Sequence, residues 1–229
     1  MPESALVLAP VRIWDLPTRL FHWLLAATVV ASVASAKIGG AAMVWHFRFG
    51  YVVLTLVCFR LLWGVLGGRW SRFASFIYAP STVLRYLRGR AAAAEHLDVG
   101  HSPTGAASVF ALLGILAVQL GTGLIADDEI ANQGPLYKYV SSETALTATS
   151  WHKSWGQWLL LGLVALHIAA ILFYLLKKHT NLVTPMLRGD KRLPPDTPAS
   201  ADGAAQRAWA LVLLALCAGL AAWVARQAG

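Results

Sequence analysis

The sequence contains few charged residues and few cysteines, and both features restrict the class of protein to which the chain can belong. Only 13% of its 229 residues are charged, whereas a soluble globular domain carries about 25%. Hydrophobic residues make up 57% of the chain, and tryptophan occurs 10 times. The cysteines Cys58 and Cys217 both lie inside apolar runs, where a thiol behaves as a small hydrophobic side chain, so we expect no disulfide. This composition excludes an ordinary soluble domain and indicates an integral membrane protein.

Long apolar segments follow one another along the chain, each close to the roughly 20 residues that a membrane-crossing helix needs. We expect spans at about residues 20–36, 44–66, 104–126, 151–176 and 208–224. Because the first apolar run is followed by further spans, we expect a retained helix and not a cleaved signal peptide. Residues 1–192 would form the main transmembrane domain, and residues 193–229 a linker with the fifth helix. The predicted fold class is an all-α integral membrane protein, a four-helix transmembrane bundle with a fifth, C-terminal transmembrane helix.

Lysine and arginine are distributed unevenly over the loops, and this sets the expected orientation. Most of them lie in the N-terminal segment and in residues 67–103 and 177–207, which the positive-inside rule places in the cytoplasm. The 37–43 turn, the acidic 127–150 loop and the C-terminus then face the other side. The net charge of +8 therefore reports orientation and does not indicate a nucleic-acid partner. An amphipathic stretch inside the 67–103 loop would lie along the membrane surface.

Histidines stand near the ends of the predicted spans, and the orientation sorts them by depth. His152 and His167 lie 15 residues apart on the fourth span. At 1.5 Å per residue this separates them by about 22 Å along one side of a helix. His46 enters its span from the same side as His152, and His22 enters from the same side as His167. The sequence therefore predicts an outer pair, His46 with His152, and an inner pair, His22 with His167.

Two imidazole pairs at two depths, from three helices, are the arrangement that would hold two haems stacked across a bilayer. Neutral imidazole is a good axial ligand of haem iron, and two of them fill both axial positions, which favours electron transfer over oxygen activation. No Cys-x-x-Cys-His occurs, which excludes a covalently attached c-type haem. A single histidine near a span end is more often an interfacial side chain, but four that pair by depth favour haem. His101 has no partner at its depth, and His96 and His179 lie in polar cytoplasmic segments. We interpret all three as solvated or loop histidines, and of these only His101 merits a test.

Arginines inside the spans are candidates for binding haem propionates. Arg60 lies 14 residues after His46, hence about 21 Å further in and level with the inner pair. Arg19 precedes His22 by three residues and shares its helix face. A guanidinium inside a membrane needs a partner, and a propionate is a suitable bidentate one. The alternative, open for both arginines, is that they snorkel toward the cytoplasmic headgroups.

Glycines follow the outer histidines at equal spacing. Gly50 and Gly156 each stand four residues after an outer histidine. A glycine there would let a flat macrocycle lie against the helix backbone. The alternative is simple helix packing, because small residues are common where membrane helices touch.

Several segments together resemble a known family. Residues 13–23, IWDLPTRLFHW, resemble the opening motif of bacterial cytochrome b561 and of nickel–iron hydrogenase b-type cytochrome subunits. Residues 100–105, GHSPTG, are similar to the start of that family's third helix, and residues 166–167 and 181–189 to its fourth helix and exit. The resemblance covers about residues 11–192. The fifth span departs from the family's minimal four-helix pattern.

The resemblance implies two non-covalent haem b groups, with His22 and His167 on one and His46 and His152 on the other. It further implies electron exchange between the quinone pool, ubiquinone or menaquinone, and a periplasmic partner, a hydrogenase small subunit or a c-type cytochrome. The chain would be a multi-pass protein of the bacterial inner membrane, with a cytoplasmic N-terminus and a periplasmic C-terminus. It would act as an electron-transfer subunit more readily than as a stand-alone oxidoreductase.

Other functions stay open on the sequence alone. The chain could be a self-sufficient oxidoreductase that passes electrons between quinone and a small diffusible molecule such as superoxide. It could also be a haem-free transporter or scaffold. The sequence leaves open the quinone-binding residues, the direction of electron flow and the oligomeric state, with a homodimer as one arrangement.

Overall fold

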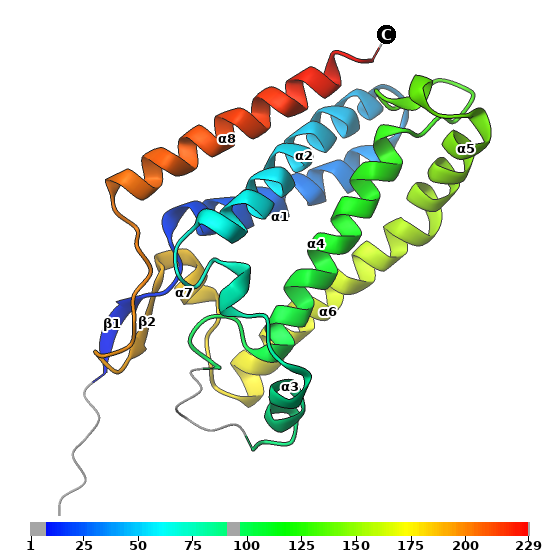
Figure 1. The fold of residues 1–229 in the computed structure, drawn as a ribbon. Coiled ribbons are helices and arrows are strands. Elements are labelled where there is room, and N and C mark those ends of the chain that lie inside the picture. The colour runs from blue at the N-terminus through cyan, green and yellow to red at the C-terminus, as the bar shows by residue number, and fades with distance from the viewer. Residues whose placement is uncertain (1–7, 91–96, 229) are drawn as a thin grey trace, which may run out of the picture.

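The computed structural model describes residues 8–90 and 97–228, and most of this part of the chain is helical (Figure 1). Within these residues, five helical runs are long and apolar enough to cross a membrane. They are α1 (Leu16–Ile38), α2 (Met43–Leu66), α4 (Pro103–Leu124), the continuous run of α5 and α6 (Ser142–Lys177) and α8 (Ala204–Ala225). This confirms the predicted all-α integral membrane fold class.

Side-chain caps fix where the long helices begin. The Asp15 carboxylate accepts the backbone N–H of Thr18 at 2.8 Å, and a proline stands in the first turn of α1. α4 begins in the same way, because the Ser102 hydroxyl accepts the N–H of Gly105 at 3.3 Å. α1 ends at Gly39, whose φ of 69° suits a residue without a Cβ.

The fourth span differs from the prediction. α5 (Ser142–Trp151) begins nine residues before the expected start, so the last nine residues of the predicted 127–150 loop are helical. A five-residue π-helix, His152–Gly156, then leads into α6 (Gln157–Lys177). The run has 36 residues, about 54 Å at 1.5 Å per residue, whereas the hydrocarbon core of a bilayer is about 30 Å thick. α5 is rich in serine and threonine and forms the polar end of this run.

α2 lies at the centre of the bundle, between α8 on one side and α4 on the other (Figure 1). One apolar cluster joins α1, α2 and α8 through Phe21, Leu56, Phe59, Trp63, Ala210, Leu213 and Cys217. A second joins α2, α4 and α6 through Val53, Val57, Leu116 and Leu160. The fifth helix therefore packs directly on the central helix of the bundle.

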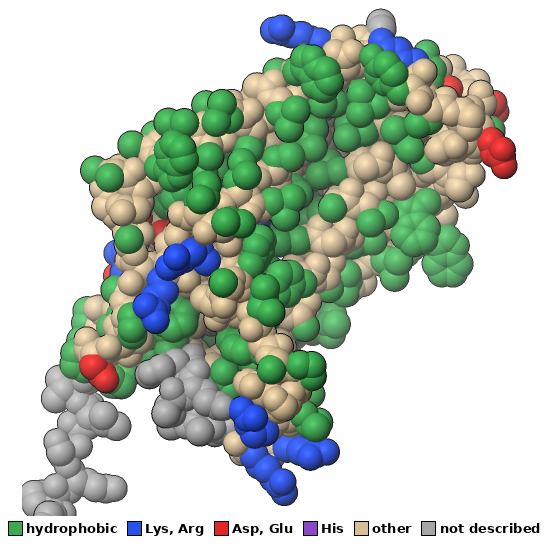
Figure 2. All heavy atoms as spheres, viewed as in Figure 1, with side chains coloured by type: hydrophobic (Ala, Val, Ile, Leu, Met, Phe, Trp, Pro, Cys, Tyr) green, Lys and Arg blue, Asp and Glu red, His purple; other side chains and the backbone are tan. Residues whose placement is uncertain are grey.

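The ends of the bundle carry the short elements and much of the charge. β1 (Ala9–Arg12) pairs antiparallel with β2 (Asp190–Leu193), a pairing that the sequence did not predict. Arg12 stabilises this pairing through two ion pairs. Its Nε lies 2.6 Å from Oδ1 of Asp190, and its Nη1 lies 2.6 Å from Oδ2 of Asp202. The pairing brings the N-terminal segment and the linker after α6 to one end of the bundle. Figure 2 shows hydrophobic side chains along the helices, with Lys and Arg gathered over α3 and Asp and Glu near the α4–α5 connection.

Only the second part of the predicted amphipathic stretch, which began at Phe73, forms the short helix α3 (Pro80–Leu87), whereas Phe76 in its first part is buried inside the protein and does not lie on a membrane surface. Apolar and polar residues lie on opposite sides of this helix, and none of its residues is buried in the protein. A second short helix, α7 (Val183–Arg188), precedes β2. Residues 91–96, which include His96, lie outside the described residues, so the interpretation of His96 is not tested.

Candidate functional site

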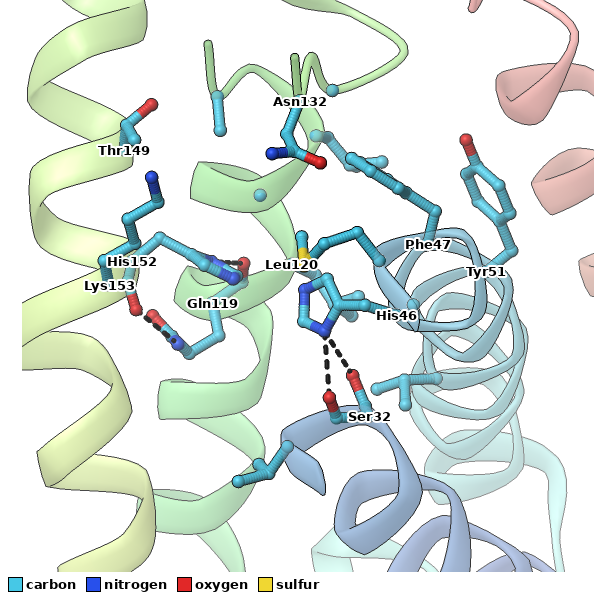
Figure 3. Close-up of a pocket in the computed structure, with 18 of the residues that line it drawn as sticks. Ser32, His46, Phe47, Tyr51, Gln119, Leu120, Asn132, Thr149, His152 and Lys153 are labelled. Carbon is cyan, nitrogen blue, oxygen red and sulfur yellow. Dashed lines mark hydrogen bonds between the residues drawn. The ribbon is translucent and has the colours of Figure 1, made fainter. Parts of the chain in front are cut away.

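The outer histidines meet across one cavity (Figure 3). His46, from the first turn of α2, and His152, from the π-helix, have ring centres 5.9 Å apart and ring planes at 81°. The cavity is lined by α1, α2, α4, the π-helix and α6, and by residues of the α4–α5 connection. The structure therefore brings together the two histidines that the sequence assigned to the outer level.

The inner histidines meet in the same way at the other end of the bundle. His22 of α1 and His167 of α6 have ring centres 6.4 Å apart and ring planes at 52°. Although His167 and His152 share one helical run, each faces a histidine from a different neighbour, α1 for the inner pair and α2 for the outer pair.

The spacing of both pairs fits one metal ion between two imidazoles. A bond from a metal to an imidazole nitrogen is about 2.0–2.1 Å for zinc, and the ring centre lies about 1 Å beyond that nitrogen. Two imidazoles on opposite sides of one metal therefore have centres roughly 6 Å apart. In the described part of the chain, no group of three or more His, Cys, Asp or Glu side chains could hold a metal ion. Each pair presents two imidazoles, the number of ligands that a six-coordinate haem takes from a protein.

Backbone carbonyls fix the tautomer of both outer histidines. Nδ1 of His46 lies 3.0 Å from the carbonyl oxygen of Ser32, and Nδ1 of His152 lies 2.9 Å from that of Gln119. Because a carbonyl only accepts hydrogen bonds, each Nδ1 must carry the proton and donate it. Each Nε2 then keeps its lone pair for a metal, the arrangement common to metal-binding histidines.

Gln119 holds His152 a second time through its side chain. The Nε2 amide of Gln119 donates to the backbone carbonyl of His152 at 3.2 Å, at the first residue of the π-helix (Figure 3). π-helical turns occur often at functional sites. Gly156 ends this turn, and a Cβ there would collide with the Gln119 side chain and lie 2.8 Å from the indole nitrogen of Trp151. Gly156 therefore serves close packing between α4 and the π-helix, the alternative interpretation given above.

Gly50 differs from Gly156 in its surroundings. It lines the outer cavity, and a Cβ built on it would meet no atom of the described chain within 4 Å. The space beside this stretch of α2 is therefore left open by the protein itself. This open space fits the hypothesis that a flat macrocycle lies against the backbone there.

Arg60 lies near the inner end of α2 and is buried, with 3% of its surface exposed. Its guanidinium carbon lies 4.6 Å from the ring centre of Phe73, and its Nη1 has no hydrogen-bond partner among the described residues. Snorkelling toward the headgroups therefore does not describe Arg60. Arg19 is partly engaged, because its Nη1 donates to the carbonyl of Leu187 in α7 at 2.6 Å, while its buried Nε has no partner in the described chain.

His101 lies in the loop before α4, as one of the two interpretations had it, but it is not solvated. Its ring packs between Trp14 and Phe76, with centres 4.7 and 4.4 Å away. Burial and, next, the positive charge of Arg60 lower the pKa of His101 to about 3, so the ring is neutral at physiological pH. Its partners come from distant segments of the chain, which is why its own sequence neighbourhood gave no signal. His179 is exposed, in keeping with a loop position.

Asp15 is a buried residue whose role the sequence analysis missed. Besides capping α1, its carboxylate accepts hydrogen bonds from the Trp63 indole at 3.1 Å, the Gly68 N–H at 3.2 Å and the Ser71 hydroxyl at 2.6 Å. It thereby joins the start of α1 to the end of α2 and the loop after it. A capping residue followed by proline was the available signal, but the partners come from tertiary structure.

Comparison with known protein families identifies the family of this chain. The family model of prokaryotic cytochrome b561 matches residues 13–189. No curated protein and no solved structure matches the chain. The matched range contains both histidine pairs, Arg60 and His101, and it ends before α8.

Proposed function

Because the chain belongs to the prokaryotic cytochrome b561 family of membrane b-type cytochromes, we propose that it binds two haem b groups in its bundle. His22 and His167 would be the axial ligands of the inner haem, and His46 and His152 those of the outer haem. The observation that carries this proposal is the pair of imidazole separations, 6.4 and 5.9 Å, at two depths of one multi-pass bundle. When bound, each haem iron supplies a one-electron redox couple.

The protein's own residues would prepare the sites for electron transfer. The carbonyls of Ser32 and Gln119 orient the outer imidazoles and fix their tautomers. Two imidazoles at each site would hold the haem and would favour electron transfer over oxygen activation. Apolar side chains of α2, α4 and α6 separate the two levels and exclude water between them.

We propose that the inner haem exchanges electrons with ubiquinone or menaquinone and the outer haem with a periplasmic redox protein. The partner would be a c-type cytochrome or a hydrogenase small subunit. The charge of the α4–α5 connection supports a basic surface on that partner. Burial alone would raise the pKa of Asp128, but hydrogen bonds from Asn132 and neighbouring backbone N–H groups hold that pKa below its usual range. The carboxylate therefore stays charged at the outer end of the bundle.

The test is a reduced-minus-oxidised visible spectrum with haem quantification on the purified protein. We expect two haems per chain. His46→Ala and His152→Ala should each remove the same haem, and His22→Ala and His167→Ala the other. One haem in the wild type would refute the dihaem proposal. Loss of the haem held by His167 in the His46→Ala variant would refute the pairing.

A second candidate function is a self-sufficient oxidoreductase that passes electrons between quinone and superoxide. Lys153 favours it, because this lysine lines the outer cavity, its side chain is 61% exposed, and its ion-pair partner, Asp128, stands 3.7 Å away at the same cavity. A positive charge there would attract a small anion. Turnover of quinone with superoxide by the purified protein, with no partner added, would support this function. Membership of a b-type cytochrome family speaks against a haem-free transporter or scaffold.

A further inference from the structure

Buried nitrogens without hydrogen-bond partners gather at the inner end of the bundle. Within residues 8–90 and 97–228, these include Nη1 of Arg60, Nδ1 of His101 and Nε of Arg19. The arginine nitrogens can only donate, and one nitrogen of a neutral imidazole also donates. Leaving a buried donor unpaired is costly, and more so when it is charged. The chain thus presents donors here that call for an acceptor from outside the chain.

A row of aromatic rings connects two of these groups, Arg60 and His101. The Arg60 guanidinium lies over Phe73, whose ring centre is 5.8 Å from that of Phe76, and Phe76 lies 4.4 Å from His101. The backbone of His101 is fixed as well, because the Tyr78 hydroxyl donates to its carbonyl at 2.6 Å. His101 and Arg60 are therefore held in place without using their free donors.

The surroundings of His101 are positive and close to the inner histidine pair. The positive charges of Arg60 and Lys191 lower the pKa of His101 further than burial does alone, and the imidazoles of His22 and His167 lie near enough to interact with it. The negative charge of Asp15 acts on Arg60, but the four hydrogen bonds that its carboxylate accepts come from α1, α2 and the loop after it, and none comes from Arg60 or His101. The missing partner is therefore an anion with more than one acceptor oxygen. A carboxylate suits a guanidinium best, because the two can form parallel hydrogen bonds.

We propose that Arg60 and His101 form a carboxylate-binding site beside the His22–His167 pair, and that its ligand is a propionate of the inner haem. Arg60 neutralises the carboxylate, and neutral His101 donates one hydrogen bond to it. The identity of the ligand rests on the proposed function, whereas the free donors are a property of the chain. The site assigns to His101 a role that its place in the sequence did not indicate.

Two substitutions of His101 separate this role from simple packing. His101→Phe keeps an aromatic ring between Trp14 and Phe76 but removes the donor, whereas His101→Gln keeps a donor and loses the ring. We expect His101→Phe to lower the midpoint potential of the inner haem, because a propionate that loses a donor favours the oxidised iron. A threefold to tenfold change in the one-electron equilibrium is expected, and tenfold corresponds to 59 mV. His101→Gln should stay within twofold of the wild type.

Arg60→Leu should lower the inner potential by tenfold or more, since it removes a full charge. In the double variant, the effect of His101→Phe should shrink, because both residues act on one carboxylate. His179→Asn is the matched control, an exposed histidine outside the spans that should leave both potentials unchanged. A role in packing alone would reverse the order of the two His101 variants and would overturn the proposal.

Infrared redox difference spectra identify the carboxylate. Haem labelled with ¹³C at its propionate carboxyl groups should show a label-sensitive band that moves in His101→Phe and not in His179→Asn. A potential shift without any change in that band would point to a lipid phosphate or a free anion and would overturn the assignment to a propionate. A wild type without an inner haem would refute the proposed function. An inner haem whose potential ignores His101→Phe would refute only this inference.

Discussion

Replacing Gln119 with leucine should weaken the outer site while leaving the inner site intact. The substitution keeps the backbone carbonyl that accepts Nδ1–H of His152, so the tautomer of the ligand is preserved. It removes the amide that donates to the His152 carbonyl at 3.2 Å. The variant therefore isolates the side-chain contact that supports the π-helix. We expect the ligand to remain present but to be held less rigidly.

The size of the effect follows from the lost hydrogen bond. A neutral hydrogen bond contributes about 1 kcal/mol, and a buried carbonyl left unpaired costs about 1–3 kcal/mol. A loss of about 1–2 kcal/mol corresponds to a roughly 5- to 30-fold weaker outer haem. Loss of groups that orient metal ligands typically costs 10–100-fold in affinity. The predicted value lies toward the lower end of that range because the contact to Nδ1 survives.

Transfer of haem to excess apomyoglobin measures this affinity. A His22→Ala background keeps only the outer haem, so its loss is recorded without overlap. Gln157→Leu is the control, since it removes an amide whose buried Nε2 has no partner in the described chain. Equal retention of the outer haem in Gln119→Leu, Gln157→Leu and the parent would refute the argued role of Gln119. That role would also be refuted if Gln119→Leu, introduced into the protein with all four histidines, released only the inner haem.

Two further substitutions test other parts of the outer site. Gly50→Ala should reduce the outer haem content without lowering the unfolding temperature of the haem-free protein, because its Cβ meets no atom of the described chain, and Gly162→Ala, equally open, should change neither. Normal haem content in Gly50→Ala would show that no macrocycle lies there. Folding lowers the pKa of Asp128, so its charged carboxylate stabilises the folded protein at pH values above the usual carboxyl pKa. This stabilisation is lost as the pH falls through the lower pKa of the folded state. The unfolding temperature should therefore fall less steeply below about pH 4 in Asp128→Asn than in the wild type, and parallel curves would contradict this.

The membrane helices and the meeting of the histidines were predictable because both follow from local pattern. Apolar length marks a span, and a spacing of 15 residues puts His152 and His167 at two depths of one helix. α5 was missed because a helix rich in serine and threonine carries little hydropathy signal. Ser141, which accepts the N–H of Thr144, was its one local sign. The pairing of β1 with β2 joins segments about 180 residues apart and has no local pattern at all.

The protein orients the imidazoles of the outer histidine pair with hydrogen bonds, but it does so much less for the inner pair. The outer imidazoles already donate to carbonyls of Ser32 and Gln119, so their orientation is set by the protein alone. At the inner pair, Nδ1 of His22 is buried without a partner in the described chain, and Nδ1 of His167 reaches only the Ser108 hydroxyl at 3.5 Å. Such a distance makes a weak hydrogen bond. The outer site is therefore preorganised by backbone contacts, whereas the inner site, with Arg60 and His101 beside it, depends on its ligand to satisfy the groups that surround it.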